Sequence, residues 1–222
     1  MFPLRDDRPT FSPPIVTICL IVVCCYVFFR EITLSDYARD LLIARYGLIP
    51  AHPSIKTMIT MMFLHGGWSH IIGNMLFLWA FGKSLEDAMG HVKFLGFYLA
   101  CGILSGVVHS AVNFGSVIPT VGASGAIAGV MGAYLVTFPR ANIKTIVFVL
   151  VFITTVELPA PIILLYWFGM QLVSGYGSIA HTHVSDAGVA WFGHIGGFVA
   201  GILLVFLMGT RKRYYRSRVY YS

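Results

Sequence analysis

The chain is dominated by long apolar segments that are separated by short polar stretches. Seven such segments occur, at residues 15–29, 68–82, 94–114, 117–138, 143–156, 162–176 and 187–208. A helix that crosses a bilayer needs about 20 apolar residues, so several of these segments are short for a full crossing. Short crossings imply a locally thinned bilayer or polar residues at membrane depth. The pattern predicts an all-α polytopic membrane protein.

Residues 143–156 decide whether the chain crosses the membrane six or seven times. This segment is followed by Glu157, Pro159 and Pro161, and it either lies at the interface or extends the fifth span inward. Lys and Arg favour the cytoplasmic side of a membrane. With six spans and an internal N-terminus, 11 of the 15 Lys and Arg lie inside: Arg5, Arg8, Lys83, Lys93, Arg140, Lys144, Arg211, Lys212, Arg213, Arg216 and Arg218. Seven spans would move the basic tail outside, so six spans are expected.

The six-span arrangement divides the chain into three parts. Residues 1–14 are expected to form a cytoplasmic N-terminal segment, 15–208 the transmembrane domain and 209–222 a basic cytoplasmic tail. The tail sequence "RKRYYRSR" suits a flank that contacts anionic lipid, and nucleic acid is a poor candidate partner. In the long first loop, apolar residues at helical spacing between Leu34 and Tyr46 predict an amphipathic helix at the outer interface.

Composition supports the membrane assignment. The chain is 57% hydrophobic and only 11% charged, whereas soluble domains carry roughly 25% charged residues. So few charges cannot cover a water-facing surface, and the bilayer is the expected solvent. All four cysteines (Cys19, Cys24, Cys25 and Cys101) lie in apolar runs. They are interpreted as small apolar residues rather than as a disulfide or zinc framework.

Four polar residues lie inside apolar segments, where polar side chains are costly and face a cavity, a partner helix or a pathway. They are His70, Asn74, Ser124 and His194. In the six-span arrangement all four lie on spans that run from outside to inside. His70 is near the start of its span, and the other three are six or seven residues in, roughly 10 Å deep at 1.5 Å per residue. All four are therefore expected at one level just under the outer face.

Each of these residues has a structural explanation when taken alone. A serine in a membrane helix often bonds back to a carbonyl one turn earlier, and a histidine or asparagine can join two helices. The pair Gly197 and Gly201 forms a G-x-x-x-G, which by itself indicates only close helix packing. A serine, two histidines and an amide at one depth are less easily explained this way. Together they supply a nucleophile, a base and oxyanion donors for acyl transfer.

Other chemistries fit the sequence less well. The chain has no H-E-x-x-H, which disfavours an intramembrane zinc protease, and no metal is expected. His181 and His183, between the last two spans, could contact a metal, but a solvated loop is favoured. Glu86 and Asp87 follow the second span and are expected to order the inner loop by capping or by pairing with Lys83.

The motifs resemble those of the rhomboid family of intramembrane serine proteases. The matching pieces are "YGLIP", "FLHGGWSHIIGNM", "FGKSLEDAMG", "GASGAIAG", "LPAPIILLYWFGMQLVSG" and "GHIGGFVAG", which together cover about residues 12–208. The resemblance implies six transmembrane helices around a polar, water-filled cavity that opens to the outside. Ser124 would be the nucleophile and His194 the general base, in a dyad without an aspartate.

The resemblance also implies roles for the neighbours of this dyad. Asn74 and His70 would join the Ser124 backbone N–H as oxyanion donors. Gly122 would allow the chain to approach the substrate carbonyl, and Gly197 would allow the sixth span to pack against the fourth. Where the family usually has an aromatic residue four positions after the serine, this chain has Ala128. The orientation of His194 must therefore come from elsewhere.

The function implied is that of a serine endopeptidase that cleaves transmembrane segments of single-span membrane proteins near the outer face, without a cofactor. The substrate would enter between the second and fifth spans, where Trp167 and Phe168 either line a gate or are packed or lipid-facing aromatics. Short loops suit a minimal prokaryotic cell-membrane protein with cytoplasmic termini. An inactive rhomboid-like protein that binds membrane segments is the alternative, and a small transporter fits less well because the polar residues cluster near one face.

Overall fold

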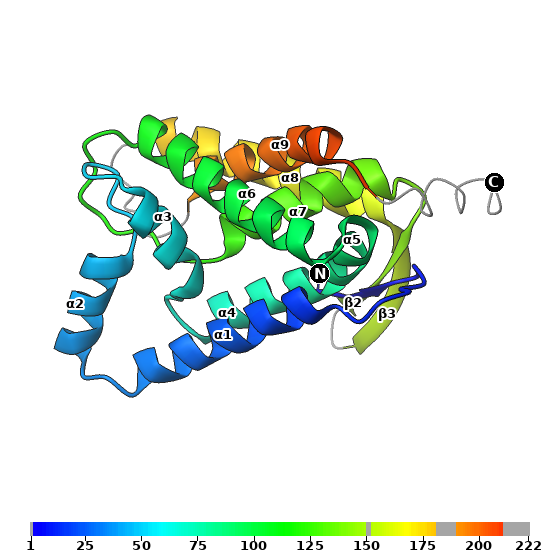
Figure 1. Ribbon diagram of the computed structural model, residues 1–222, viewed down its shortest axis with the longest axis horizontal. Helices are drawn as coiled ribbons and strands as arrows, with labels where there is room; N and C mark the ends of the chain where they lie inside the picture. Colours follow the sequence, from blue (N-terminus) through cyan, green and yellow to red (C-terminus); the bar gives the residue numbers. More distant parts are fainter. Residues whose placement is uncertain (1, 150–151, 181–189, 211–222) are drawn as a thin grey trace.

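Helices form most of the molecule, with one small sheet beside them (Figure 1). The computed structural model describes residues 2–149, 152–180 and 190–210. The elements, in chain order, are β1 (Phe2–Asp6), α1 (Ile15–Ile32), α2 (Asp36–Tyr46), α3 (Ile55–Thr60), the 3₁₀ helix η1 (Met61–Phe63), α4 (Trp68–Phe77), the π-helix η2 (Leu78–Gly82), α5 (Lys83–Met89), α6 (His91–Val112), α7 (Ser124–Thr137), β2 (Asn142–Val149), β3 (Phe152–Pro159), α8 (Ala160–Ala180) and α9 (Trp191–Met208).

Three helices of the described chain, α1, α6 and α9, are long and apolar enough to cross a membrane. Helix α7 is apolar but has only 14 residues. Helices α4, η2 and α5 follow one another without a break from Trp68 to Met89. The mostly helical membrane protein predicted from the sequence is therefore confirmed at this level. In the first loop, a helix is present as expected: α2 begins after Ser35 and has no buried residue, and its position at the outer interface stays a prediction.

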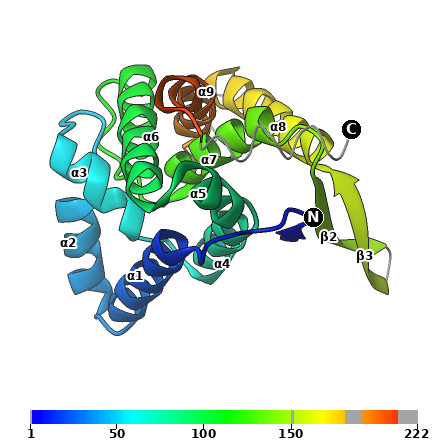
Figure 2. The same ribbon diagram turned by 45° about the vertical axis from the view of Figure 1, so that its right-hand side comes forward.

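The expectation of an all-α fold was wrong at residues 142–159. Within this range Asn142–Val149 and Phe152–Pro159 form the antiparallel strands β2 and β3, and β1 pairs with β2 to complete a three-stranded sheet. Figure 2 shows this sheet to one side of the helices. Most residues of the hairpin are β-branched or aromatic, which favours a pleated strand. A short apolar run does not distinguish a strand from a buried helix by its period, so the sequence reading missed the hairpin.

Helix α7 lies at the centre of the helices and packs against α9 and α6 (Figure 2). Its residues from Gly125 to Tyr134 are all buried. The contact with α9 is a contact between backbones: a Cβ added at Gly197 would collide with the carbonyl oxygen of Gly125, and one at Gly201 with that of Gly129. The predicted tight packing at Gly197 is present. Glycine is needed here because a side chain would force the two helices apart.

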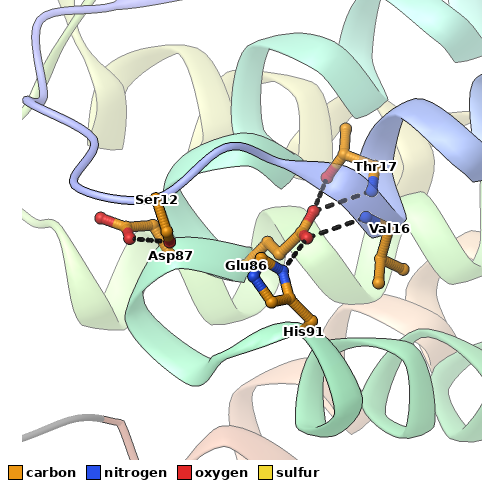
Figure 3. Close-up of polar contacts among 6 residues, drawn as sticks. All are labelled: Ser12, Val16, Thr17, Glu86, Asp87 and His91. Carbon is orange, nitrogen blue, oxygen red and sulfur yellow. Dashed lines mark hydrogen bonds and ion pairs between the residues drawn. The ribbon is translucent and has the colours of Figure 1, made fainter.

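Helix α1 is fixed at its start by the Glu86 carboxylate of α5 (Figure 3). Pro14 precedes the helix and provides no side-chain cap. The Glu86 carboxylate instead accepts hydrogen bonds from the N–H groups of Val16 and Thr17, both at 2.8 Å, and from the Thr17 hydroxyl at 2.6 Å. It also contacts the His91 ring at 2.6 Å. Glu86 thus satisfies N–H groups that a helix start leaves without partners, and its charge is favourable there.

Two further contacts attach the N-terminal segment to the helices. Asp87 accepts hydrogen bonds from the Phe11 N–H, at 2.9 Å, and from the Ser12 hydroxyl (Figure 3). Lys83 pairs with Asp6 at 3.0 Å rather than with the acids of α5. The expected capping by Glu86 and Asp87 is therefore present, but its target is the chain before and at the start of α1.

Candidate active site

Ser124 is the first residue of α7, not a residue seven positions inside a helix. The seven residues before it, 117–123, form an irregular segment rather than about two helical turns. Thr120 pairs with Leu48 through two backbone hydrogen bonds of 2.8 and 2.9 Å, and the Gly122 N–H donates to the Met61 carbonyl at 2.9 Å. These bonds tie the segment to the first loop and to η1, so the continuous helix from which the depth of Ser124 was calculated is not present. The hydroxyl instead lies at a helix N-terminus, where backbone N–H groups are available.

Ser124 and His194 are in direct contact. The Nε2 atom of His194 lies 2.7 Å from the Ser124 hydroxyl oxygen, a hydrogen-bond distance. His194 is the fourth residue of α9 and is buried. The backbone contact between Gly125 and Gly197 explains the distance, because it holds α7 and α9 close together just beside both side chains. The structure thus brings together the two residues that the sequence singled out as nucleophile and base.

Gln171 is a residue that the sequence reading missed. It is buried on α8, and its Oε1 atom lies 2.8 Å from the Nδ1 atom of His194. Trp167, one turn earlier, lies against the same imidazole with a centroid distance of 5.8 Å and an interplanar angle of 40°. These two side chains support the ring of His194, whereas Ala128 provides only a methyl group. A lone glutamine in the apolar run 162–176 was the signal available in the sequence.

His70 lies beside Gly122 at the approach to Ser124. The His70 Nδ1 atom accepts a long hydrogen bond, of 3.4 Å, from the Gly66 N–H, which leaves Nε2 as the protonated nitrogen of a neutral ring. Nε2 would lie 2.7 Å from a Cβ added at Gly122. Gly122 also has a φ of 128°, a conformation that other residues rarely adopt. Glycine is therefore required at this position for two independent reasons, and the approach of a substrate carbonyl to Gly122 stays a prediction.

Asn74 presents a hydrogen-bond donor that no atom of the described residues uses. It lies one turn after His70 on α4 and is buried. Within the described part of the chain, its Nδ2 atom has no hydrogen-bond partner. Buried amide groups are nearly always paired, so an unpaired one calls for an explanation. A ligand that brings an oxygen atom into the site would supply the partner.

These side chains line a single cavity of about 770 Å³. Its lining includes His70, Asn74, Ser124, Trp167, Gln171 and His194. Of the two expected gate residues, Trp167 lines this cavity, whereas Phe168 stacks on Phe198 of α9 with ring centroids 4.5 Å apart. Helices α4, α7, α8 and α9 therefore all contribute to one polar site.

Metal ligation finds little support in the part of the chain that the structure describes. Within it, no group of three or more His, Cys, Asp or Glu side chains could hold a metal ion. His181 and His183, considered above as loop ligands, lie outside the described residues.

Comparison with known proteins gives the family of this chain. Residues 52–211, more than half of the chain, match the family model described as the Rhomboid domain. The chain therefore belongs to the rhomboid family, as its motifs indicated. Members of this family are generally intramembrane serine proteases.

Individual relatives agree with this assignment. The chain is 28% identical over 211 residues to rhomboid protease GluP of Bacillus subtilis (strain 168). The aligned region covers 94% of this chain and 36% of that protein. It is 30% identical over 162 residues to RHOMBOID-like protein 1 of Arabidopsis thaliana. This aligned region covers 71% of this chain and 35% of that protein. The chain thus spans about a third of the length of these two relatives.

Proposed function

We propose that this protein is an intramembrane serine endopeptidase that cleaves transmembrane segments of single-span membrane proteins. The observation that supports this function most strongly is the 2.7 Å contact between Ser124 and His194 in a cavity that also contains the unpaired amide of Asn74. A nucleophile in hydrogen-bond contact with a base is the arrangement that acyl transfer needs. GluP, which aligns with 94% of this chain, is named a rhomboid protease.

The first chemical step is the attack of Ser124 on a substrate carbonyl. The Ser124 hydroxyl oxygen forms a bond to the carbonyl carbon while Nε2 of His194 takes the hydroxyl proton. His194 must be neutral at this moment, with its proton on Nδ1, so that Nε2 has a free electron pair. The result is a tetrahedral intermediate with a negatively charged oxygen, next to an imidazolium.

Three donors are proposed to bind that oxygen. They are the backbone N–H of Ser124, at the start of α7, the Nδ2 group of Asn74 and the protonated Nε2 of His70. The N-terminal end of α7 adds a favourable partial positive charge. Donors that are already in place cost no reorganisation during the reaction, and one such donor typically contributes about 3–4 kcal/mol of transition-state stabilisation.

Collapse of the intermediate breaks the peptide bond. His194 gives its proton to the leaving amine, and the other half of the substrate remains as an ester on Ser124. A water molecule then attacks the ester while His194 takes the proton of the water, and the serine leaves with that proton. The net reaction is hydrolysis of one peptide bond, and it consumes only water.

For the topology we propose six spans with both termini in the cytoplasm and the cavity open to the outside. The spans would be α1, the run from α4 to α5, α6, α7, α8 and α9, so that 15–208 is the transmembrane domain, flanked by cytoplasmic segments 1–14 and 209–222. The register of the sheet supports this arrangement, because Arg5 of β1 pairs with Lys144 of β2. Two paired basic residues lie on the same side of the membrane, and basic residues favour the cytoplasmic side. A prokaryotic cell membrane is the proposed location.

The substrate is proposed to enter between α4 and α8, with Trp167 and Phe168 near the entrance. A membrane helix hides its peptide bonds in its own hydrogen bonds, so the cleaved segment must unwind near the outer surface. Segments with Gly or Pro at that level unwind most readily, because these two residues have the lowest helix propensities. The small residues around Ser124 leave room for a small side chain before the scissile bond.

The test is a cleavage assay in proteoliposomes. The substrate would be a single-span protein with a Gly- and Ala-rich segment at its outer membrane boundary, and products would be analysed by mass. We expect wild type to cut within that segment, and Ser124→Ala and His194→Ala to be inactive. If wild type cuts none of several such substrates but still binds them, the protein is a rhomboid-like binding protein instead. Cleavage that survives Ser124→Ala would also contradict the proposal.

A further inference from the structure

The orientation of the Gln171 side chain is defined from both ends of its amide. Its Nε2 group donates to the carbonyl oxygen of Trp167 at 3.2 Å, one turn back along α8. A glutamine amide has one donor end and one acceptor end, so the oxygen must be the atom that faces His194. That oxygen, Oε1, lies 2.8 Å from Nδ1 of His194.

An acceptor at Nδ1 decides which nitrogen of His194 carries the proton. Gln171 Oε1 can only accept in this contact, so Nδ1 must be the donor. In the neutral ring the proton then resides on Nδ1, and Nε2 is left with the free electron pair that faces Ser124 at 2.7 Å. The tautomer that a general base needs is thus selected by a side chain of a neighbouring helix.

We propose that Gln171 is a positioning residue that forms, with His194 and Ser124, a three-membered chain of hydrogen bonds. This inference rests on the proposed function and adds a residue to it. Gln171 holds the imidazole in the tautomer with Nε2 free, and its carbonyl dipole stabilises the imidazolium that forms when Ser124 loses its proton. It acts through His194 and does not contact the reacting bond.

The aromatic rings that pack around His194 do not select its tautomer. The ring of Trp167 lies near the imidazole at 5.8 Å, and Trp191 meets it edge-on with centroids 6.3 Å apart. Such rings limit the plane of His194, but they offer no acceptor to Nδ1 and do not distinguish the two tautomers. On the α7 side, Ala128 has only a methyl group to offer. The hydrogen bond from Gln171 is therefore the specific element of the support.

The test compares two isosteric variants of the only glutamine in the chain. Gln171→Met keeps the length of the side chain and removes the acceptor, whereas Gln171→Glu keeps an acceptor and adds a charge. Ser174→Ala, one turn further along α8, is the control for a small change in the same helix. Each protein is assayed for kcat, KM and the rate of Ser124 labelling by a fluorophosphonate, with thermal unfolding in detergent as the measure of folding.

We expect Gln171→Met to lower kcat and the labelling rate by about 10-fold or more, with KM within twofold and the unfolding temperature nearly unchanged. One lost hydrogen bond to a group that becomes charged corresponds to such a factor. Gln171→Glu is expected to retain activity within a few-fold of wild type. Ser174→Ala should match wild type in all measurements.

The pH dependence separates positioning from packing. Among the described residues, the titratable side chains on other elements whose charge acts on His194 are His70 of α4 and His109 of α6, and both are unchanged in all the variants. In Gln171→Met the imidazolium of His194 loses its acceptor and is less stable than in wild type. In Gln171→Glu it faces a carboxylate and is more stable. The acidic limb of the kcat/KM profile should therefore lie at the lowest pH in Gln171→Met, higher in wild type and highest in Gln171→Glu.

Two results would overturn the inference while leaving the proposed function intact. One is an active wild type whose pH profile coincides with those of both variants. The other is a folded Gln171→Met with kcat and labelling within twofold of wild type. Failure of the proposed function has a different signature, in which wild type itself neither cleaves substrate nor reacts with the fluorophosphonate at Ser124.

Discussion

The amide group of Asn74 and the hydroxyl group of Ser124 line the same cavity, but only the hydroxyl has a partner within the described chain. Ser124 is paired with His194 at 2.7 Å, whereas Nδ2 of Asn74 is buried without a hydrogen bond. An unpaired buried donor costs stability, roughly 1–3 kcal/mol. A protein retains such a group where a ligand atom or a transition state uses it.

This relationship predicts that Asn74 contributes to catalysis but not to stability. Asn74→Ala should lower kcat by about 10²–10³-fold, the usual effect of removing one oxyanion donor. The thermal unfolding temperature should stay the same or rise, because an unpaired donor is removed. Cleavage kinetics and thermal unfolding in the same detergent would measure both effects.

Asn113 provides a matched control for that prediction. Its amide nitrogen donates to the His109 carbonyl at 2.9 Å, so it is an asparagine whose donor is already used. Asn113→Ala should cost about 1 kcal/mol of stability and leave kcat nearly unchanged. The assignment of Asn74 as an oxyanion donor would be untenable if Asn74→Ala lost stability and kept its kcat.

The backbone contact between α7 and α9 predicts unequal effects of the same substitution at two glycines. Gly197→Ala should destabilise the protein by about 1–3 kcal/mol or more and separate His194 from Ser124, because the added Cβ collides with the Gly125 carbonyl. At Gly96, on α6, a Cβ would meet nothing within 4 Å. Gly96→Ala should therefore be neutral or stabilise the protein by about 0.5–1 kcal/mol.

Unfolding followed by circular dichroism, with cleavage measured in parallel, would check this pair of variants. Equal stability of Gly197→Ala and Gly96→Ala would mean that the two helices can separate without cost. The distance between Ser124 and His194 would then need another explanation.

The carboxylate cap of α1 predicts a large loss of stability at Glu86. Glu86→Ala removes the acceptor for the Val16 and Thr17 N–H groups and for the Thr17 hydroxyl. Three donors lose their partner, so the loss should be about 3 kcal/mol or more. Glu86→Gln keeps one acceptor oxygen and should fall between Glu86→Ala and wild type.

An exposed acid tests whether the loss is specific to the cap. Asp36, in the first turn of α2, forms an ion pair of 3.6 Å with Arg39 and is almost fully exposed. Asp36→Ala should cost no more than about 1 kcal/mol. Comparable losses for Glu86→Ala and Asp36→Ala, measured by thermal unfolding, would show that the cap contributes little.

The sequence predicted the helical membrane architecture, and it singled out Ser124 and His194, which the structure brings into contact, for clear physical reasons. Long apolar runs can be satisfied only by a bilayer or a very large core, and the ordered motifs around His70, Ser124 and His194 resemble those of the rhomboid family, whose model matches residues 52–211. The hairpin at 142–159 was missed because an apolar run of that length fits a strand or a helix. The pairing of Thr120 with Leu48, which holds the chain before Ser124 outside the helix, is a long-range contact that the apolar run 117–138 did not reveal.

Gln171 shows why the remainder of the site could not be read from the sequence. It lies 23 positions before His194 in the chain, on a different helix, and no local spacing relates the two. Only the packing of α8 against α9 brings the amide to Nδ1. A polar residue in an apolar run marked the position as unusual, but its partner depended on the three-dimensional structure.

The most direct test of the account is whether Ser124 is a nucleophile that His194 activates. Purified protein would be treated with a fluorophosphonate, and the site of the adduct mapped by mass spectrometry in wild type, Ser124→Ala and His194→Ala. We expect one adduct in wild type, on Ser124, no adduct in Ser124→Ala and labelling slowed by at least about 10²-fold in His194→Ala. Equal labelling of Ser124 with and without His194, or none in wild type, would contradict the account.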